Sequence, residues 1–168
     1  MAVLVDSDIT KGLNFQFCKE LQASYNYYCA SSWFGLKGFS GFQHWFLKQS
    51  KEELEHARKL YDFLMARDIK LIPADLVAGR TEFATVSEVF KWGLELEIQV
   101  EKDYNDLCRL CLEKKDLTTY QFLEWFLNEQ VEEIETFKNF LDNVVDLEGD
   151  PSALRLFDNE LLEKLKSS

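Results

Sequence analysis

The chain has 168 residues, of which 46% are hydrophobic, so it is long enough for one domain with a sizeable core. Its formal charge of −11 argues against nucleic acid as a partner and suits cations. No apolar run is long enough to span a membrane, and no signal peptide opens the sequence. Cys108 and Cys111 form an isolated C-x-x-C inside a helical pattern, which favours packing over the alternative of metal or redox chemistry. We expect a single domain over residues 1–168, cytoplasmic or, if a transit peptide was removed, plastid.

Residues that break helices are scarce: the chain contains seven glycines and two prolines, which predicts an all-α protein. A first helix is expected to begin near Asp6-Ser7-Asp8, where a capping side chain is available, and to end at Gly35 and Gly38. A second helix is expected over residues 40–68, whose first residue and Gln43 have the spacing of a capping box. The same signals predict three more helices: a third from the capping box of Thr85 and Glu88 to about Lys115, a fourth from Asp116 to about Leu147, and a short fifth that Asp150 caps, with Pro151 in its first position.

The lengths of the connections predict how these helices are arranged. The first two helices are joined by a short link, as are the third and fourth, so each pair should form an antiparallel hairpin. Residues 69–85 are different, because an extended chain of that length reaches about 55 Å, whereas a helix of about 27 residues is about 40 Å long. This segment can therefore cross the whole bundle and make the second and third helices parallel. We expect a four-helix bundle with a long crossover and a short C-terminal fifth helix.

Two short stretches of the sequence repeat one pattern at a distance of 77 residues. The first is Glu52-Glu53-Leu54-Glu55-His56 and the second is Glu129-Gln130-Val131-Glu132-Glu133. Each places metal-binding groups three residues apart, and groups at that spacing share one face of a helix. A Glu-x-x-His type pair of this kind is typical of bundles that hold two metal ions between their helices.

The repeat extends to residues upstream of both stretches. A lone carboxylate lies 33 residues before the central Glu or Gln of each stretch, at Glu20 and at Glu97. A tyrosine follows each carboxylate by seven residues, at Tyr27 and Tyr104, and seven residues are almost two helical turns. Each tyrosine is therefore expected to point the same way as the carboxylate before it.

Metal binding would explain how several carboxylates and one imidazole can be buried together, because bare ionised groups are costly in a core. Oxygen-rich sites with a single His suit iron or manganese, and Glu53 is expected to bridge two ions. Taken alone, Glu53 and His56 could lie on an exposed charged face, Glu97 and Glu101 could be surface acids, and Tyr27 could be an ordinary core residue. Only the joint spacing favours a metal centre.

The same stretches carry a family resemblance. Residues 46–57, FLKQSKEELEHA, resemble the second-helix signature of non-haem ferritins, and residues 126–133, FLNEQVEE, are similar to their fourth-helix signature. The resemblance covers nearly the whole chain, including the short fifth helix. It implies a ferritin-like bundle, a homo-oligomeric shell of twenty-four subunits, and a di-iron ferroxidase centre in each subunit.

The resemblance also implies roles for particular residues. It assigns three sets of iron ligands: Glu20, Glu53 and His56 for a first ion; Glu53, Glu97 and Glu133, with Gln130 as a neutral neighbour, for a second; and Glu52, Glu129 and Glu132 for a third site found in microbial ferritins. Tyr27 matches the tyrosine that hydrogen-bonds near the centre and can supply an electron. Glu101 is an extra carboxylate one turn beyond Glu97, and it is either a transit ligand or a surface acid.

Some positions depart from related families. A bacterioferritin would have His in place of Glu133 and a haem-binding Met in place of Leu54, so no haem is expected. The acids that line the three-fold channels of animal ferritins match Tyr120 and Leu123 here, so an acidic entry of that kind is not implied. Tyr104 is more like bacterioferritin than animal ferritin.

These implications lead to one functional expectation and two alternatives. The expected function is iron storage, in which the subunit oxidises Fe(II) with O₂ or H₂O₂ and delivers Fe(III) to a mineral core. The first alternative is another di-iron oxidase or peroxidase on the same bundle. The second is a helical shell that buffers iron without catalysis. In each case residues 69–85 are too apolar for a free loop, and we expect them to pair across a two-fold subunit contact.

Overall fold

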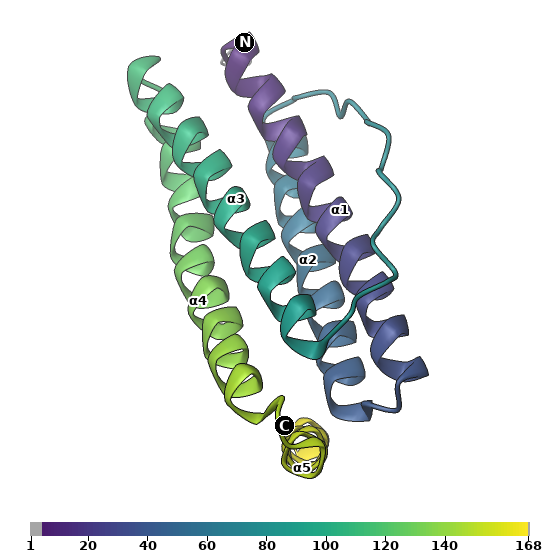
Figure 1. The fold of residues 1–168 in the computed structure, drawn as a ribbon. Helices are drawn as coiled ribbons and strands as arrows, with labels where there is room; N and C mark the ends of the chain where they lie inside the picture. The colour runs from purple at the N-terminus through teal and green to yellow at the C-terminus, as the bar shows by residue number, and fades with distance from the viewer. Residues whose placement is uncertain (1–4, 168) are drawn as a thin grey trace.

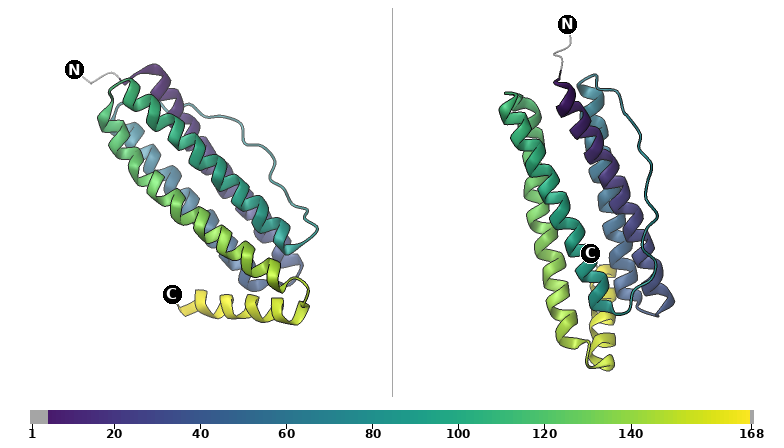
Figure 2. Two further views of the ribbon diagram at one scale, coloured as in Figure 1. Left: turned by 60° about the vertical axis from the view of Figure 1, so that its left-hand side comes forward. Right: turned by 45° about the horizontal axis from the view of Figure 1, so that its top comes forward.

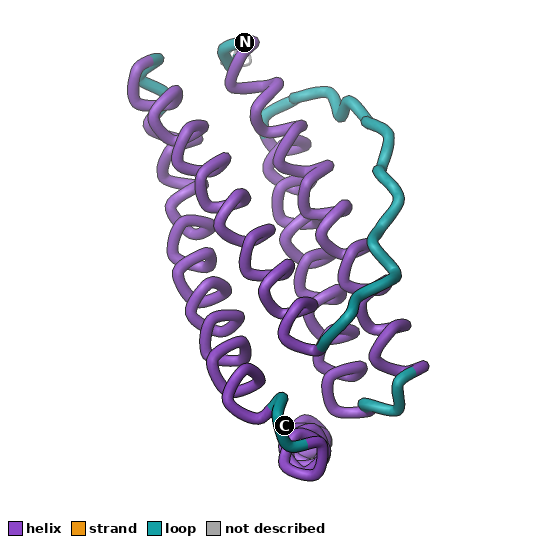
Figure 3. The backbone as a smooth tube through the Cα atoms, in the orientation of Figure 1, coloured by secondary structure: helices purple, strands orange, loops and turns teal. Residues whose placement is uncertain are grey.

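The computed structural model describes residues 5–167, which form five α-helices and, within that range, no strand (Figures 1 and 3). The helices are α1 (Ser7–Leu36), α2 (Ser40–Ala66), α3 (Val86–Glu113), α4 (Leu117–Leu147) and α5 (Pro151–Ser167). The four long helices form a bundle, and the short α5 crosses one end of it (Figure 2). The predicted four-helix bundle with a short C-terminal helix is therefore confirmed.

The predicted order of the helices in space is also confirmed. α1 and α2 form one antiparallel hairpin, and α3 and α4 form the other (Figure 1). Between the hairpins, residues 67–85 run along the bundle beside α1, so that α3 begins at the end of the bundle where α2 also begins. α2 and α3 are therefore parallel. A short loop between them would have made them antiparallel.

Side chains close to the start of each helix satisfy free backbone N–H groups at most of the predicted positions. The hydrogen bonds are Asp8 N to Asp6 Oδ1 at 2.9 Å for α1, Glu88 N to Thr85 Oγ1 at 3.1 Å for α3, Thr119 N to Asp116 Oδ1 at 3.0 Å for α4, and Ser152 N to Asp150 Oδ1 at 2.9 Å for α5. Local sequence is sufficient for these four helix starts, because the acceptor lies within three residues of the donor.

The start of α2 differs from the prediction. Ser40 is the first residue of the helix and not its cap, and the capping residue Phe39 makes no hydrogen bond through its side chain. The acceptor comes instead from α5, where the buried Asp158 accepts a hydrogen bond from Phe42 N at 2.8 Å. Gly41 permits this approach, since a Cβ there would collide with the carbonyl oxygen of Asp158. The predicted capping box was wrong because a distant element supplies the acceptor.

Two hydrophobic clusters fill the bundle, one toward each end. The cluster near α5 is rich in aromatic rings and includes Phe34, Phe46 and Phe90, whose centroids lie 5.3 to 5.9 Å apart. The cluster at the other end is mainly aliphatic, with residues such as Leu13 and Leu60 fully buried. Between the clusters the buried side chains are polar, and these residues form the candidate site.

Two amide side chains of α1 hold the crossover segment in place. Asn14 Oδ1 accepts a hydrogen bond from Ile72 N at 2.6 Å, and Gln22 bonds both backbone groups of Val77, at 2.6 and 2.9 Å. The segment still exposes apolar side chains, with Ile72 50%, Leu76 46% and Val77 73% accessible. The expectation that this surface lies in a subunit contact stays a prediction.

Candidate metal centre

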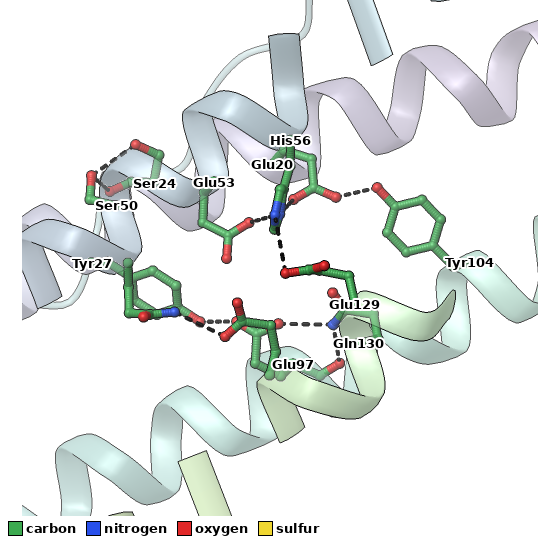
Figure 4. Close-up of polar contacts among 12 residues, drawn as sticks. Glu20, Ser24, Tyr27, Ser50, Glu53, His56, Glu97, Tyr104, Glu129 and Gln130 are labelled. Atoms are coloured by element: carbon green, nitrogen blue, oxygen red, sulfur yellow. Dashed lines mark hydrogen bonds and ion pairs between the residues drawn. The ribbon is translucent and has the colours of Figure 1, made fainter. Parts of the chain in front are cut away.

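All four helices of the bundle contribute polar side chains to one buried region (Figure 4). The residues are Glu20 from α1, Glu53 and His56 from α2, Glu97 from α3, and Gln130 and Glu133 from α4, and each is at most 7% exposed. The pairs on α2 and α4 share a face because three residues are almost one helical turn. The structure therefore brings together every residue that the resemblance assigned to the first two iron sites.

Three of these residues already converge. One ligand atom from each of Glu20, Glu53 and His56 lies within 4.8 Å of the others. His56 Nδ1 is 3.1 Å from Glu53 Oε2 and 3.6 Å from Glu20 Oε2. Among the described residues, no other three His, Cys, Asp or Glu side chains place their ligand atoms this close together.

The carboxylates of Glu97 and Glu133 accept hydrogen bonds from neutral side chains. Gln130 Nε2 donates to Glu97 Oε2 at 2.9 Å, and the hydroxyl of Tyr27 donates to Glu97 Oε1. Gln49 Nε2 donates to Glu133 Oε2 at 2.9 Å. Hydrogen bonds from neutral side chains thus orient both oxygens of Glu97 and one oxygen of Glu133.

Glu53 provides the test of whether a cation fits this region. Its Oε2 faces His56, whereas its Oε1 is buried and has no hydrogen-bond partner in the part of the chain that the structure describes. A buried carboxylate oxygen without a donor is costly, and a bound cation would remove that cost. Oxygen donors with a single imidazole match the preferences of iron and manganese. The residues present therefore fit a metal centre that includes Glu53.

The electrostatics of the region reflect the concentration of carboxylates. Burial raises the pKa of Glu53 and of Glu97, and burial together with the charge of Glu97 raises the pKa of Glu133 to about 8. Burial alone would lower the pKa of His56, but hydrogen bonds to Glu20 and Glu53 outweigh it and raise the pKa to about 11. At neutral pH the region without a cation therefore holds protons that a metal ion would displace.

Two buried tyrosines donate hydrogen bonds to the carboxylates of the opposite hairpin. Tyr27 on α1 donates to Glu97 on α3, and Tyr104 on α3 donates to Glu20 on α1 (Figure 4). Burial and the neighbouring carboxylates raise the pKa of both phenols, so both remain donors at neutral pH. The sequence placed each tyrosine on the face of the carboxylate before it, but each bonds to the carboxylate of the other hairpin.

The outer acids are arranged less closely. Glu129 Oε1 is 3.9 Å from His56 Nε2, and its side chain is 28% exposed. Glu52 lies close enough to raise the pKa of Glu133, while its carboxylate pairs with Lys48 at 3.3 Å. Within residues 5–167, the carboxylates of Glu132 and Glu101 make no hydrogen bond or ion pair with the centre. Glu132 is exposed and Glu101 is half-buried.

Sequence reasoning missed two residues that support the centre. Gln49 lies four residues before Glu53 on the same face of α2, and that spacing could have drawn attention to it. Its counterpart 77 positions later is Phe126, whose ring lies edge-on to His56 at 6.2 Å. The carboxylate Glu133 thus has an amide donor beside it, whereas the imidazole has an aromatic ring.

The C-x-x-C pair lies outside the candidate centre. Cys108 and Cys111 are buried in the aliphatic cluster, and burial raises their pKa values to about 11 and about 12. Both are free thiols, which agrees with the predicted packing role. Among the described residues, no helix is both long enough and apolar enough to cross a membrane.

A bundle of two hairpins joined by a crossover, with carboxylates and a histidine facing inward from all four helices, defines the class of ferritin-like proteins. The family model for the ferritin-like domain matches residues 10–146, and the chain belongs to the ferritin family.

Comparison with individual proteins gives the same result. The chain is 33% identical over 162 residues to a bacterial non-haem ferritin of Staphylococcus haemolyticus, covering 94% of this chain and 95% of the relative. It is 29% identical over 158 residues to one of Staphylococcus aureus, with the same coverage. The structure matches the open-pore ferritin of Archaeoglobus fulgidus with a TM-score of 0.92 and 30% identity, over 94% of this chain and 98% of that chain. These relatives are bacterial or archaeal, which gives the plastid alternative no support.

Proposed function

We propose that this protein is an iron-storage ferritin subunit that oxidises Fe(II) and passes Fe(III) to a mineral. The observation that carries this proposal is the different surroundings of the two oxygens of Glu53. Oε2 contacts His56, whereas Oε1 is buried and has no hydrogen-bond partner among the described residues, so it could bind a second cation. A single bridging carboxylate holds two Fe(II) ions close enough to deliver two electrons to one O₂.

In this proposal iron is the substrate and the side chains bind it in two unequal sites. Glu20, Glu53 and His56 bind the first ion, while Glu53, Glu97 and Glu133 bind the second beside the neutral Gln130. Two Fe(II) ions give one electron each to O₂, which takes up two protons and leaves as H₂O₂. The peroxide can oxidise two further Fe(II) ions and, with two more protons, become two molecules of water. No haem takes part.

The remaining acids are proposed to move iron rather than to oxidise it. Glu129 lies 3.9 Å from His56, so it is suited to receive an ion that leaves the triad. Glu52 and Glu132 would complete a third, more open site with Glu129, and Glu101 would act in transit one turn from Glu97. Tyr27, bonded to Glu97, is proposed to act where only one further Fe(II) is at hand. That Fe(II) and Tyr27 then give one electron each to H₂O₂. Tyr27 also gives up its phenolic proton, and with one more proton the peroxide becomes two molecules of water and Tyr27 a neutral tyrosyl radical.

We further propose that the protein works as a homo-oligomeric shell of twenty-four subunits in the cytoplasm. The family membership and the apolar crossover surface support assembly, and a hollow shell is what a mineral core requires. The substrates of the proposed reaction are Fe(II) and an oxidant, which is O₂ or H₂O₂.

The direct test is Glu53→Ala, assayed by absorbance and O₂ uptake after addition of two Fe(II) per subunit. The rapid oxidation phase should disappear, because both ions lose a ligand, while slow oxidation on mineral surfaces survives. The matched control is Glu55→Ala, which removes an exposed carboxylate two residues away that pairs with Lys51. A rapid phase of normal size in Glu53→Ala would contradict the proposal.

The same assay separates the two alternatives. A di-iron oxidase or peroxidase with a permanent metal pair would bind two iron ions per subunit and accumulate no more. An iron buffer without a competent centre would bind Fe(II) without rapid O₂ uptake. Iron storage predicts both rapid uptake of O₂ and accumulation of many ions per subunit in an oxidised core.

A further inference from the structure

The repeat of 77 residues extends to a reciprocal pair of hydrogen bonds, of which one partner has no assigned role. Tyr27 donates to Glu97, and Tyr104, its counterpart in the repeat, donates to Glu20. We propose that Tyr104 is a positioning residue for the first iron site, where its hydroxyl fixes Glu20 so that one carboxylate oxygen is presented to the metal. This inference rests on the proposed iron centre and adds a residue that controls how tightly its first site binds a cation.

The two oxygens of Glu20 are used differently. Oε1 accepts the hydrogen bond from Tyr104, whereas Oε2 lies 3.6 Å from His56 Nδ1 and belongs to the converging triad. With Oε1 bonded to a fixed donor, Glu20 has lost the freedom to rotate its carboxylate away. A ligand that is oriented before the metal arrives binds it more tightly, because less conformational entropy is lost on binding.

The ring of Tyr104 cannot follow the carboxylate if Glu20 moves. Tyr104 is fully buried and stacks on Phe126, with ring centroids 4.9 Å apart and an angle of 17° between the planes. The same Phe126 ring lies edge-on to His56. One aromatic wall therefore supports both ligands that are specific to the first site, Glu20 through the hydroxyl and His56 through the ring contact.

The second site offers an internal comparison, because its carboxylate is held twice. Glu97 accepts hydrogen bonds from Tyr27 and from Gln130 Nε2, the latter at 2.9 Å. Removal of the Tyr27 hydroxyl leaves Glu97 with the hydrogen bond from Gln130 to its Oε2, at 2.9 Å. Removal of the Tyr104 hydroxyl leaves Glu20 with only the longer contact of 3.6 Å to His56 Nδ1 among the described residues. The two tyrosines should therefore affect different sites, and Tyr104 should have the larger effect.

The test uses Zn(II) as a redox-inert cation, so that binding is measured without oxidation. Tyr104→Phe keeps the ring and its stack on Phe126 and removes only the hydroxyl. Loss of such a hydrogen bond to a metal ligand weakens binding by about 10- to 100-fold. We expect calorimetry to show that loss at one of two Zn(II) sites. Anomalous scattering from soaked crystals should show that the weakened site is the one beside His56. Tyr27→Phe is the mirror control and should reduce occupancy beside Glu133 instead.

A second measurement does not depend on a variant. In wild-type crystals soaked with Zn(II), Tyr104 should still donate to the oxygen of Glu20 that does not bind zinc. A zinc-bound structure in which Glu20 has released Tyr104 would overturn the inference, as would Tyr104→Phe with unchanged binding or with equal losses at both sites. Absence of Zn(II) from both wild-type sites would instead overturn the proposed metal centre itself.

Discussion

Three of the carboxylates buried in the bundle are costly to ionise when no cation is bound. Glu53, Glu97 and Glu133 all have pKa values raised by burial, and His56 is held in its charged form by two carboxylates. Proteins tolerate such groups where ligand binding compensates for the cost. At the residue scale, cation binding and stability should therefore be linked.

The first prediction concerns that linkage in the metal-free protein. Folding raises the pKa of Glu133 from 4.5 to about 8 and that of His56 from 6.5 to about 11, so the folded state binds more protons than the unfolded state. Stability conferred by these protons is complete at low pH and is lost as pH rises through each folded pKa. The melting temperature of the metal-free protein should therefore fall between pH 6 and pH 9. Added Zn(II) should flatten this fall, and Glu133→Gln should reduce it. A melting temperature that rises over this range would contradict the linkage.

The second prediction at this scale concerns Tyr27. If it supplies an electron during O₂ reduction, freezing the reaction early should trap a tyrosyl radical that is visible by electron paramagnetic resonance. The signal should be absent from Tyr27→Phe and retained in Tyr104→Phe, because only Tyr27 is assigned this role. A signal of equal size in Tyr27→Phe would transfer the role to another residue.

At the scale of elements, the contact between α5 and α2 shows how a short helix contributes to the bundle. Asp158 is 2% exposed, and it accepts the hydrogen bond from Phe42 N that a local cap would otherwise accept. Arg155 adds hydrogen bonds to the turn between α1 and α2, at Gly38 O and at 2.9 Å to Lys37 O. α5 thus secures the end of the bundle where α2 and α3 begin.

The third prediction tests this contact. Asp158→Ala should destabilise the protein by about 0.5–2 kcal/mol, the range for loss of a helix cap. For a chain of this size each kcal/mol corresponds to about 2–4 °C in melting temperature. Asp158→Asn keeps an acceptor oxygen and should lose less. Asp142→Ala, which removes an exposed carboxylate on α4, should change the melting temperature very little. Equal effects of Asp158→Ala and Asp142→Ala would show that the buried hydrogen bond does not stabilise α2.

At the scale of the whole molecule, the apolar side chains of the crossover remain exposed although Asn14 and Gln22 fix its backbone. Other large side chains, on α1, are also exposed, including Tyr28 at 53%. Apolar surface of this kind usually marks a protein contact.

The fourth prediction is that this surface lies between subunits. Analytical ultracentrifugation should find a large homo-oligomer, and Leu76→Asp with Val77→Asp should shift the distribution toward smaller species. Val145→Glu places a similar charge on an exposed apolar position of α4 and serves as the control. A stable wild-type monomer would exclude both the shell and the proposed contact. Unchanged assembly of the Leu76 and Val77 double variant would exclude only the contact.

Sequence by itself determined the class of the fold and the set of candidate ligands. Helix starts with an acceptor within three residues, such as Asp116, follow from local chemistry. The long segment between α2 and α3 determined the parallel arrangement, because only a crossover of that length can span the bundle. The repeated spacing of Glu20 with Glu53 and of Glu97 with Gln130 identified residues that share faces, since helical periodicity is fixed by the backbone.

Tertiary structure decided which of these groups bond to one another. Periodicity gives the face on which Tyr27 or Tyr104 lies but not the helix that faces it, so the exchange of partners between the hairpins was not predictable. The cap of α2 by Asp158 and the support of Glu133 by Gln49 also join residues far apart in the chain. Local sequence determines where a helix begins and on which face of it each side chain lies. The distance between side chains on different helices depends instead on how the helices pack.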